Sequence, residues 1–353
     1  MWLRPNIKTL AKERLHSYDR IRAIAILMVV GVHCLPSYDA PFIGEISSHS
    51  YNELLRTLFF TCNALFFMLS GRFNLRILDD SAYRRYYYRR IRGVLVPVLI
   101  YLLIYTLFNM YPDYYSVPNV LETYFYNSMG ALSHGIFWFV FSLFGMLMVA
   151  PFLAHAFSKP SQTFQKAFFI IWLVWNVVNN FSENLSFDFS WSYPFWGFLF
   201  FFCVGGFIED SFFNRMKTRS LLLLGVGVWL ANALLAYLGW SVGAYDTSPF
   251  YGITAICLYL LILRIKPGTG SALGKCVSFI AVRSLDIYLL HWLAVLVLQP
   301  YFLPLSQISG ILYHVCFTVC IFAIALVAAA VIEAVLIKPI QKLMDKVFRQ
   351  KSG

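Results

Sequence analysis

The segment DRIRAIAILMVVGVHCLP, from Asp19 to Pro36, places charged side chains at the start of an apolar stretch and a histidine deep inside it. Asp19 and Arg22 are three positions apart, the spacing of neighbours on one helical face. His33 follows Arg22 by eleven residues, which puts both on one face with a rise of about 16 Å between them. Arginine binds phosphate, and histidine serves as general base or nucleophile. A histidine packed against a neighbouring backbone is the structural alternative.

A second histidine stands in the late apolar segment SLDIYLLHWL, from Ser284 to Leu293. Tyr288 and His291 are three positions apart and share a helical face. Ionisable side chains are costly inside a membrane, and they usually face a bundle interior or a water-filled cavity. Two intramembrane histidines therefore favour a polar site within the bundle.

An arginine-rich stretch lies between these two segments, and it reads AYRRYYYRRIRG around its centre. Arginine forks hold phosphate in a bidentate manner, which suits a donor with several phosphates such as coenzyme A. Attraction to anionic lipid, together with the setting of topology, explains the same arginines without a ligand. Just before the stretch, Ser70 and Gly71 interrupt an apolar run, and a helix end there could receive a ligand. The residues between 72 and 92 that form the stretch are Arg72, Arg76, Arg84, Arg85, Arg89, Arg90 and Arg92.

The composition defines the elements that position these residues. The chain is 59% hydrophobic and only 13% charged, whereas a soluble domain is about 25% charged. Apolar runs long enough to cross a bilayer recur along the chain. The sequence therefore predicts an all-α fold, a polytopic transmembrane bundle of about ten helices. The expected ranges are 21–37, 54–71, 94–110, 135–153, 167–183, 194–208, 220–239, 249–265, 278–300 and 311–337.

The positive-inside rule sets the predicted orientation. With both termini in the cytoplasm, every one of the 28 lysines and arginines except Arg56 falls in an inner segment. The chain is thus expected to form one integral-membrane domain over residues 1–353, with a cytoplasmic segment at 1–20 and a basic cytoplasmic tail at 338–353. The net charge of +11 follows this topology, so nucleic acid is not an expected partner. The seven cysteines have no metal-ligand spacing, and no metal is expected.

Five motifs in this order resemble the integral-membrane acyltransferase-3 family over nearly the whole chain. The first is Asp19-Arg20-Ile21-Arg22 followed by His33, although the family usually has glycine where Arg20 stands. His134 lies four residues before Trp138, where the family often has a His-Leu-Trp run, so no role is transferred to it. The other four motifs are FFMLSG (66–71), RRIR (89–92) before Pro97, FWFVFSLFGMLMVAPFL (137–153) with Trp138 and Pro151, and IYLLH (287–291).

The resemblance implies a membrane O-acyltransferase, most commonly an O-acetyltransferase, of a bacterial cell membrane. Its donor would be cytoplasmic acyl-CoA, with acetyl-CoA as the expected substrate. Its acceptor would be a hydroxyl of a cell-surface polysaccharide or lipid-linked glycan, and membrane lipid surrounds it. The alternative is a transporter or flippase for a small solute or lipid-linked sugar, which would need no acyl-CoA. The implied site comprises His33 and Asp19 as catalytic residues, Arg22, Arg89, Arg92 and Ser70 for the donor, and Tyr288, His291 and Trp138 as accessory residues.

Overall fold

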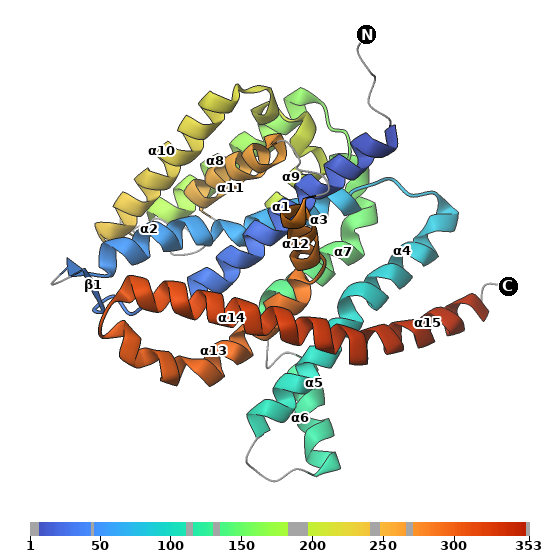
Figure 1. Ribbon diagram of the computed structural model, residues 1–353. Helices are drawn as coiled ribbons and strands as arrows, with labels where there is room; N and C mark the ends of the chain where they lie inside the picture. The colour runs from blue at the N-terminus through green and yellow to red at the C-terminus, as the bar shows by residue number, and fades with distance from the viewer. Residues whose placement is uncertain are drawn as a thin grey trace.

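The computed structural model describes residues 7–43, 46–110, 116–129, 135–182, 197–240, 248–265 and 271–350, and almost all of them are helical (Figure 1). A short antiparallel pair, β1 (Pro41–Ile43) and β2 (Ile46–Ser47), follows the first helix. The helices are α1 (Ile7–His33), α2 (His49–Phe59), α3 (Thr61–Asn74), α4 (Tyr83–Arg90), α5 (Val96–Met110), α6 (Val117–Met129), α7 (Phe137–Phe157), α8 (Gln162–Ser182), α9 (Phe198–Phe207), α10 (Thr218–Tyr237), α11 (Pro249–Arg264), α12 (Ala272–Val282), α13 (Ser284–Ser306), α14 (Gly310–Ile332) and α15 (Lys338–Gln350).

Six helical stretches within the described ranges are long and apolar enough to cross a membrane. They confirm the prediction of an all-helical membrane bundle, while the number ten and the orientation stay predictions. α11 is apolar but shorter, and α1 carries Asp19, Arg20 and Arg22 within its length. The six stretches are His49–Asn74, Asp80–Met110, Phe137–Phe157, Thr218–Tyr237, Ser284–Ser306 and Gly310–Phe348.

Two local features differ from the expected helices. The segment expected as one helix over 278–300 is divided at Arg283, where α12 ends and α13 begins, and Arg283 is paired with Glu333 of the last stretch. Helix α6 was not expected, because its apolar residues form only a narrow stripe at helical spacing. That stripe, Val117, Leu121 and Phe125, is exposed.

The centre of the bundle is α1, which packs against α2, α3, α11, α12, α13 and α14 (Figure 1). The closest helix crossing lies beside it, between α3 and α9. A Cβ atom added at Gly71 would lie 1.8 Å from the Phe202 carbonyl oxygen, and one at Gly205 would lie 1.9 Å from that of Met68. α3 therefore does not end at Ser70 and Gly71, as the sequence suggested it could. It continues to Asn74, and Gly71 serves close helix packing, as small residues do in membrane bundles.

Two π-helical turns occur in the described residues, Ile91–Leu95 between α4 and α5 and Glu333–Ile337 between α14 and α15, and both pack against α5. Each ends two residues before a proline, which has no N–H and clashes with the carbonyl four residues earlier. In the first turn the Val96 N–H bonds to Ile91 instead of Arg92. The Arg92 carbonyl would next meet Pro97, so it lacks a helical donor. The Gln341 side chain from α15 donates to it at 3.0 Å, which ties the first turn to α15.

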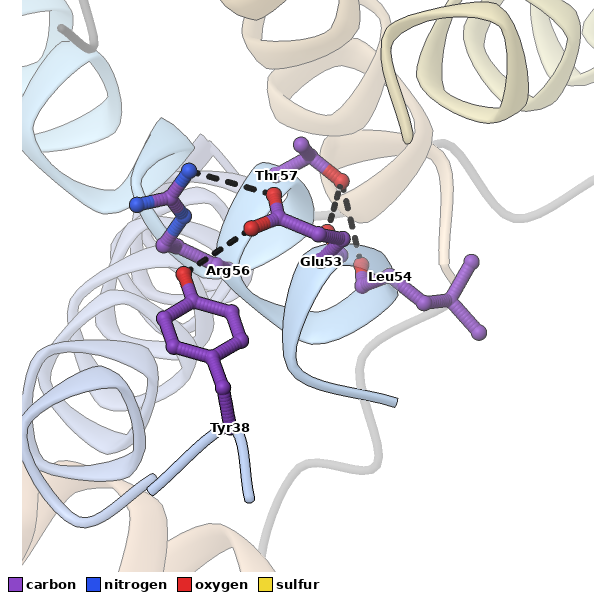
Figure 2. A network of polar contacts seen from close by, with 5 residues as sticks. All are labelled: Tyr38, Glu53, Leu54, Arg56 and Thr57. Atoms are coloured by element: carbon purple, nitrogen blue, oxygen red, sulfur yellow. Dashed lines mark hydrogen bonds and ion pairs between the residues drawn. The ribbon is translucent and has the colours of Figure 1, made fainter. Parts of the chain in front are cut away.

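Arg56 stands in the last turn of α2, and it is the single basic residue that the sequence predicts on the outer side of the membrane (Figure 2). Its guanidinium donates to the Glu53 carboxylate at 3.1 Å, and that carboxylate also accepts from the Tyr38 hydroxyl at 2.9 Å. Thr57 donates back to the backbone carbonyls of Glu53 and Leu54. The charge of Arg56 is thus balanced by a neighbour one turn away, and the network joins the segment after α1 to α2.

Candidate active site

A cavity of 210 Å³ opens where the charged half of α1, the end of α3 and the end of α4 meet α7 and α13. Its polar lining consists of two guanidinium groups, two hydroxyls of serine, one amide and one phenol. The cavity is smaller than the about 300–1,000 Å³ of most ligand pockets, so it suits one part of a large ligand. Its lining residues are Arg22, Phe66, Leu69, Ser70, Phe73, Asn74, Arg90, Val94, Phe139, Leu143, Leu147, Ser284, Leu285 and Tyr288.

Arg22 is held in the cavity wall from two sides. Asp19 accepts from its guanidinium at 3.1 Å, and the Phe73 ring lies 5.2 Å below the guanidinium carbon. The second carboxylate oxygen of Asp19 accepts from the Ser278 hydroxyl at 2.8 Å. Asp19 thus holds the guanidinium of Arg22 and lies fourteen positions before His33, about 21 Å along the helix. A catalytic role for Asp19 stays a prediction.

Three arginines are held by carboxylates from elements distant in the chain. Arg72 pairs with Glu209, Arg283 with Glu333, and Arg92 with Asp345 of α15. Tyr88 also donates to Asp345, at 2.7 Å. These pairs join helices and leave little of each fork for a ligand.

Arg90 differs, because it lines the cavity and is paired with no carboxylate in the described part of the chain. Its guanidinium stacks on the Tyr86 ring at 5.0 Å, and its buried Nε has no hydrogen-bond acceptor there. Arg89 is exposed on α4, and neither Arg89 nor Arg92 lines the cavity. Sequence reasoning expected those two and missed Arg90, although Arg90 stands in the same motif. A role in donor binding stays a prediction for Arg89 and Arg92.

Ser70 lies in the cavity wall, as expected for a residue near the donor. Its carbonyl accepts from the Asn74 amide at 2.7 Å, and the buried Asn74 Oδ1 has no donor among the described residues. The wall at Ser70 and Asn74 thus presents a hydroxyl and an open amide oxygen, both suited to hydrogen bonding with an amide-bearing chain.

A row of rings leads from the cavity to His33. Phe139 and Tyr288, both in the cavity wall, have ring centroids 4.9 Å apart. The next steps are Tyr288 to His291 at 5.7 Å and His291 to His33 at 5.1 Å. Tyr288 is fixed in this row because its hydroxyl donates to the Ile136 carbonyl at 2.7 Å. The two histidines that the sequence singled out are therefore neighbours, and the face of α13 connects them to the arginine cavity.

The two histidines have different surroundings. Protein atoms leave the His33 side chain exposed, with Trp292 edge-on to its ring at 5.3 Å. His291 is fully buried, and its Nδ1 lies 2.6 Å from the Tyr288 carbonyl oxygen. Its Nε2 has no hydrogen-bond partner in the part of the chain that the structure describes.

A third intramembrane histidine, His314 of α14, was not singled out from the sequence. Its Nε2 lies 2.9 Å from the Gly31 carbonyl oxygen, and its Nδ1 lies 2.6 Å from the Tyr51 hydroxyl. Both ring nitrogens are occupied, so His314 joins α14 to α1 and α2. Only the pattern of partners, which the sequence does not contain, separates it from His291.

Two further residues were considered with the family resemblance, Trp138 and His134. Trp138 packs against Phe139 and Phe198, and it does not line the cavity. His134 lies outside the described residues. Within the described ranges no group of three histidine, cysteine, aspartate or glutamate side chains could hold a metal ion.

The described residues thus form a helical membrane bundle in which a row of rings connects an arginine-lined cavity to an exposed histidine. The model of the acyltransferase-3 family, described as an acyltransferase domain, matches residues 15–330. Because the match covers most of the chain, the protein belongs to this family and is an acyltransferase of groups other than aminoacyl. Comparisons with curated proteins and with solved structures found no match.

Proposed function

We propose that the protein is an O-acetyltransferase that moves an acetyl group from cytoplasmic acetyl-CoA to a hydroxyl of an extracytoplasmic or lipid-linked cell-surface glycan. In this proposal the single domain crosses the cell membrane ten times, with both termini in the cytoplasm. One observation carries it: the row Tyr288, His291 and His33 connects a cavity with two arginines to an exposed imidazole.

The donor's phosphates would bind Arg22 and Arg90 at the cytoplasmic end of the cavity. Guanidinium forks match phosphate oxygens, and Arg90 has no carboxylate to displace. The pantetheine arm would then follow the wall of Ser70, Asn74 and Tyr288. Arg22 and His33 are about 16 Å apart along α1, and an extended pantetheine arm is of that order.

His33 would act as the general base. It takes the proton of the acceptor hydroxyl while the hydroxyl oxygen bonds to the thioester carbonyl carbon. The carbon–sulfur bond then breaks, and coenzyme A leaves as a thiolate that receives the proton from the imidazolium. In a two-step variant the His33 nitrogen first takes the acetyl group as the carbon–sulfur bond breaks and coenzyme A becomes a thiolate. The hydroxyl oxygen then takes the acetyl group from His33, and the hydroxyl proton passes to the thiolate. Both routes need the exposed ring that the structure has.

The test combines donor binding with transfer. Acetyl-CoA at 100 times its Kd should stabilise the purified protein by about 2.7 kcal/mol, whereas a transporter of another solute should not respond. His33→Ala should retain this stabilisation and lose acetyl transfer to the envelope glycan. His155→Ala is the matched control, since His155 is an exposed histidine of α7 outside the cavity. Undiminished transfer by a folded His33→Ala protein would exclude the assignment.

A further inference from the structure

We propose that His291 is a positioning residue that fixes the tautomer of His33, by accepting a hydrogen bond from one ring N–H of His33 so that the other nitrogen stays unprotonated on the exposed side of the ring. This rests on the proposed function, because it specifies how His33 becomes a base. Four observations on α1 and α13 lead to it.

The first observation assigns the protons of His291. Its Nδ1 lies 2.6 Å from the Tyr288 carbonyl oxygen, and a carbonyl oxygen only accepts. Nδ1 must therefore carry a hydrogen. A buried imidazolium without a counter-charge is costly in a membrane, so the ring is neutral and has a single N–H. Nε2 of His291 is consequently an acceptor with a free lone pair.

The second observation is that this acceptor lacks a donor. His291 has no exposed surface, and Nε2 has no partner among the described residues. Leaving a buried acceptor unpaired costs free energy, so a nearby donor gains by turning toward it. The carbonyl of Tyr288 holds the ring and prevents Nε2 from turning away.

The third observation identifies the donor. The His33 ring is 5.1 Å from that of His291 between centroids, with an angle of 40° between the planes. At this separation, rotation of one ring can bring a nitrogen of each within hydrogen-bonding distance. His33 is exposed and can rotate, whereas His291 is pinned. The mobile ring thus adjusts to the fixed one.

The fourth observation concerns the consequence for His33. A neutral imidazole that donates through one nitrogen must present a lone pair at the other. The indole of Trp292 stands edge-on to the same ring at 5.3 Å and limits its alternative orientations. When the free nitrogen takes the acceptor's proton, both nitrogens of His33 carry hydrogens, and the lone pair of His291 stabilises the new cation. No proton leaves the pair in this step.

Three variants of His291 test the proposal in the full-length protein. His291→Phe keeps the ring and removes both nitrogens. His291→Gln places an amide oxygen near the position of Nε2, where it can accept from His33. His291→Asn is the matched control, because its shorter amide reaches only the position of Nδ1 and can bond to the Tyr288 carbonyl alone.

We expect kcat for acetyl transfer to fall about 100-fold in the Phe and Asn variants, within the range of acid–base contributions. The Gln variant should recover about tenfold over Asn. KM for acetyl-CoA and the thermal stabilisation by acetyl-CoA should stay at the wild-type level in all three, which a general loss of structure would not allow.

Equal kcat values for Gln and Asn, or a Phe variant within threefold of wild type, would overturn the proposal. If the Phe variant does not fold, the Gln and Asn pair decides alone. His33→Ala separates the two levels: an active His33→Ala protein contradicts the proposed function, whereas an inactive one beside a fully active His291→Phe protein contradicts only the role of His291.

Discussion

Two buried histidines face α1 from neighbouring helices, and they differ in how many of their nitrogens are occupied. His314 of α14 contacts the Gly31 carbonyl with one nitrogen and the Tyr51 hydroxyl with the other, at 2.9 and 2.6 Å. His291 of α13 has a partner at Nδ1 only, and its Nε2 points to none of the described residues. Both rings are almost or fully buried, at 5% and 0% exposure.

The difference is the basis on which we propose a role in catalysis for His291 and a structural role for His314. An unpaired buried acceptor costs about 1–3 kcal/mol, so a fold that needs only a helix bridge would satisfy both nitrogens, as at His314. The open nitrogen of His291 is a cost that the fold alone does not explain. It lies beside the exposed ring of His33, which is the general base in the proposed mechanism.

The largest expected effect is on activity. His33→Gln should reduce acetyl transfer about 10²- to 10⁴-fold, because an amide cannot take a proton as a base. The rate of acetyl transfer by His314→Gln, per mole of folded protein, should stay within about threefold of the wild-type rate. Both nitrogens of the His314 ring are bonded to Gly31 and Tyr51, so we expect no general acid–base role for this residue. Initial rates with acetyl-CoA, normalised to folded protein, measure both. Equal losses would remove the distinction between the two histidines.

Replacement of His314 or His291 by phenylalanine should change the free energy of unfolding to different extents. His314→Phe removes the two hydrogen bonds that the ring makes, to the Tyr51 hydroxyl and to the Gly31 carbonyl, for a loss of about 2–3 kcal/mol and a Tm several degrees lower. The Gly31 carbonyl still accepts from the Cys34 N–H, which limits the loss. His291→Phe removes the Nδ1 bond to the Tyr288 carbonyl together with a buried Nε2 that has no partner among the described residues, so the two effects offset and its Tm should fall less than that of His314→Phe. The Tm values of the two variants are compared by thermal unfolding in one detergent. A lower Tm for His291→Phe than for His314→Phe would contradict the assignment of His314 as the structural histidine.

Much of this arrangement follows from local physics that a sequence displays. Apolar length predicts the membrane helices, and helix geometry places Arg22 and His33 on one face of α1. The spacing of Tyr288 and His291 likewise predicts a shared face of α13, and in the structure their ring centroids are 5.7 Å apart. These predictions depend on positions within one helix.

What could not be predicted depends on how one helix is rotated against another. The π-helical turn Ile91–Leu95 inserts an extra residue, and each residue turns the helix by about 100°. The turn therefore decides whether Arg89, Arg90 or Arg92 faces the cavity. The hydrogen-bond partners of His314 are likewise distant in the chain: Gly31 is 283 residues away. No spacing rule identifies such a partner.

The same contrast between an occupied and an open group applies to two arginines of one motif: Arg92 is paired with Asp345, whereas Arg90 lines the cavity and has no carboxylate partner among the described residues. Arg90→Gln should weaken acetyl-CoA binding at least tenfold, since a hydrogen bond to a charged group contributes about 1.5–3 kcal/mol. Arg92→Gln should leave the donor Kd unchanged and lower Tm, because it breaks the pair with Asp345. Thermal-shift titrations with acetyl-CoA give both quantities. A larger loss of acetyl-CoA affinity in Arg92→Gln than in Arg90→Gln would mean that the donor binds Arg92, as the family motif predicts, and not Arg90 of the cavity wall.

The smallest effect tests whether the His314 bridge is one unit. Tyr51→Phe removes the hydroxyl that donates to Nδ1, and it should cost about 1 kcal/mol with acetyl transfer unchanged. If the hydroxyl stabilises the fold through His314, the Tyr51→Phe/His314→Phe double variant should be no less stable than His314→Phe alone, because contacting partners are not additive. Additive losses would mean that Tyr51 acts through other neighbours. A loss of acetyl transfer in Tyr51→Phe would instead extend the functional region from His291 to the opposite face of α1.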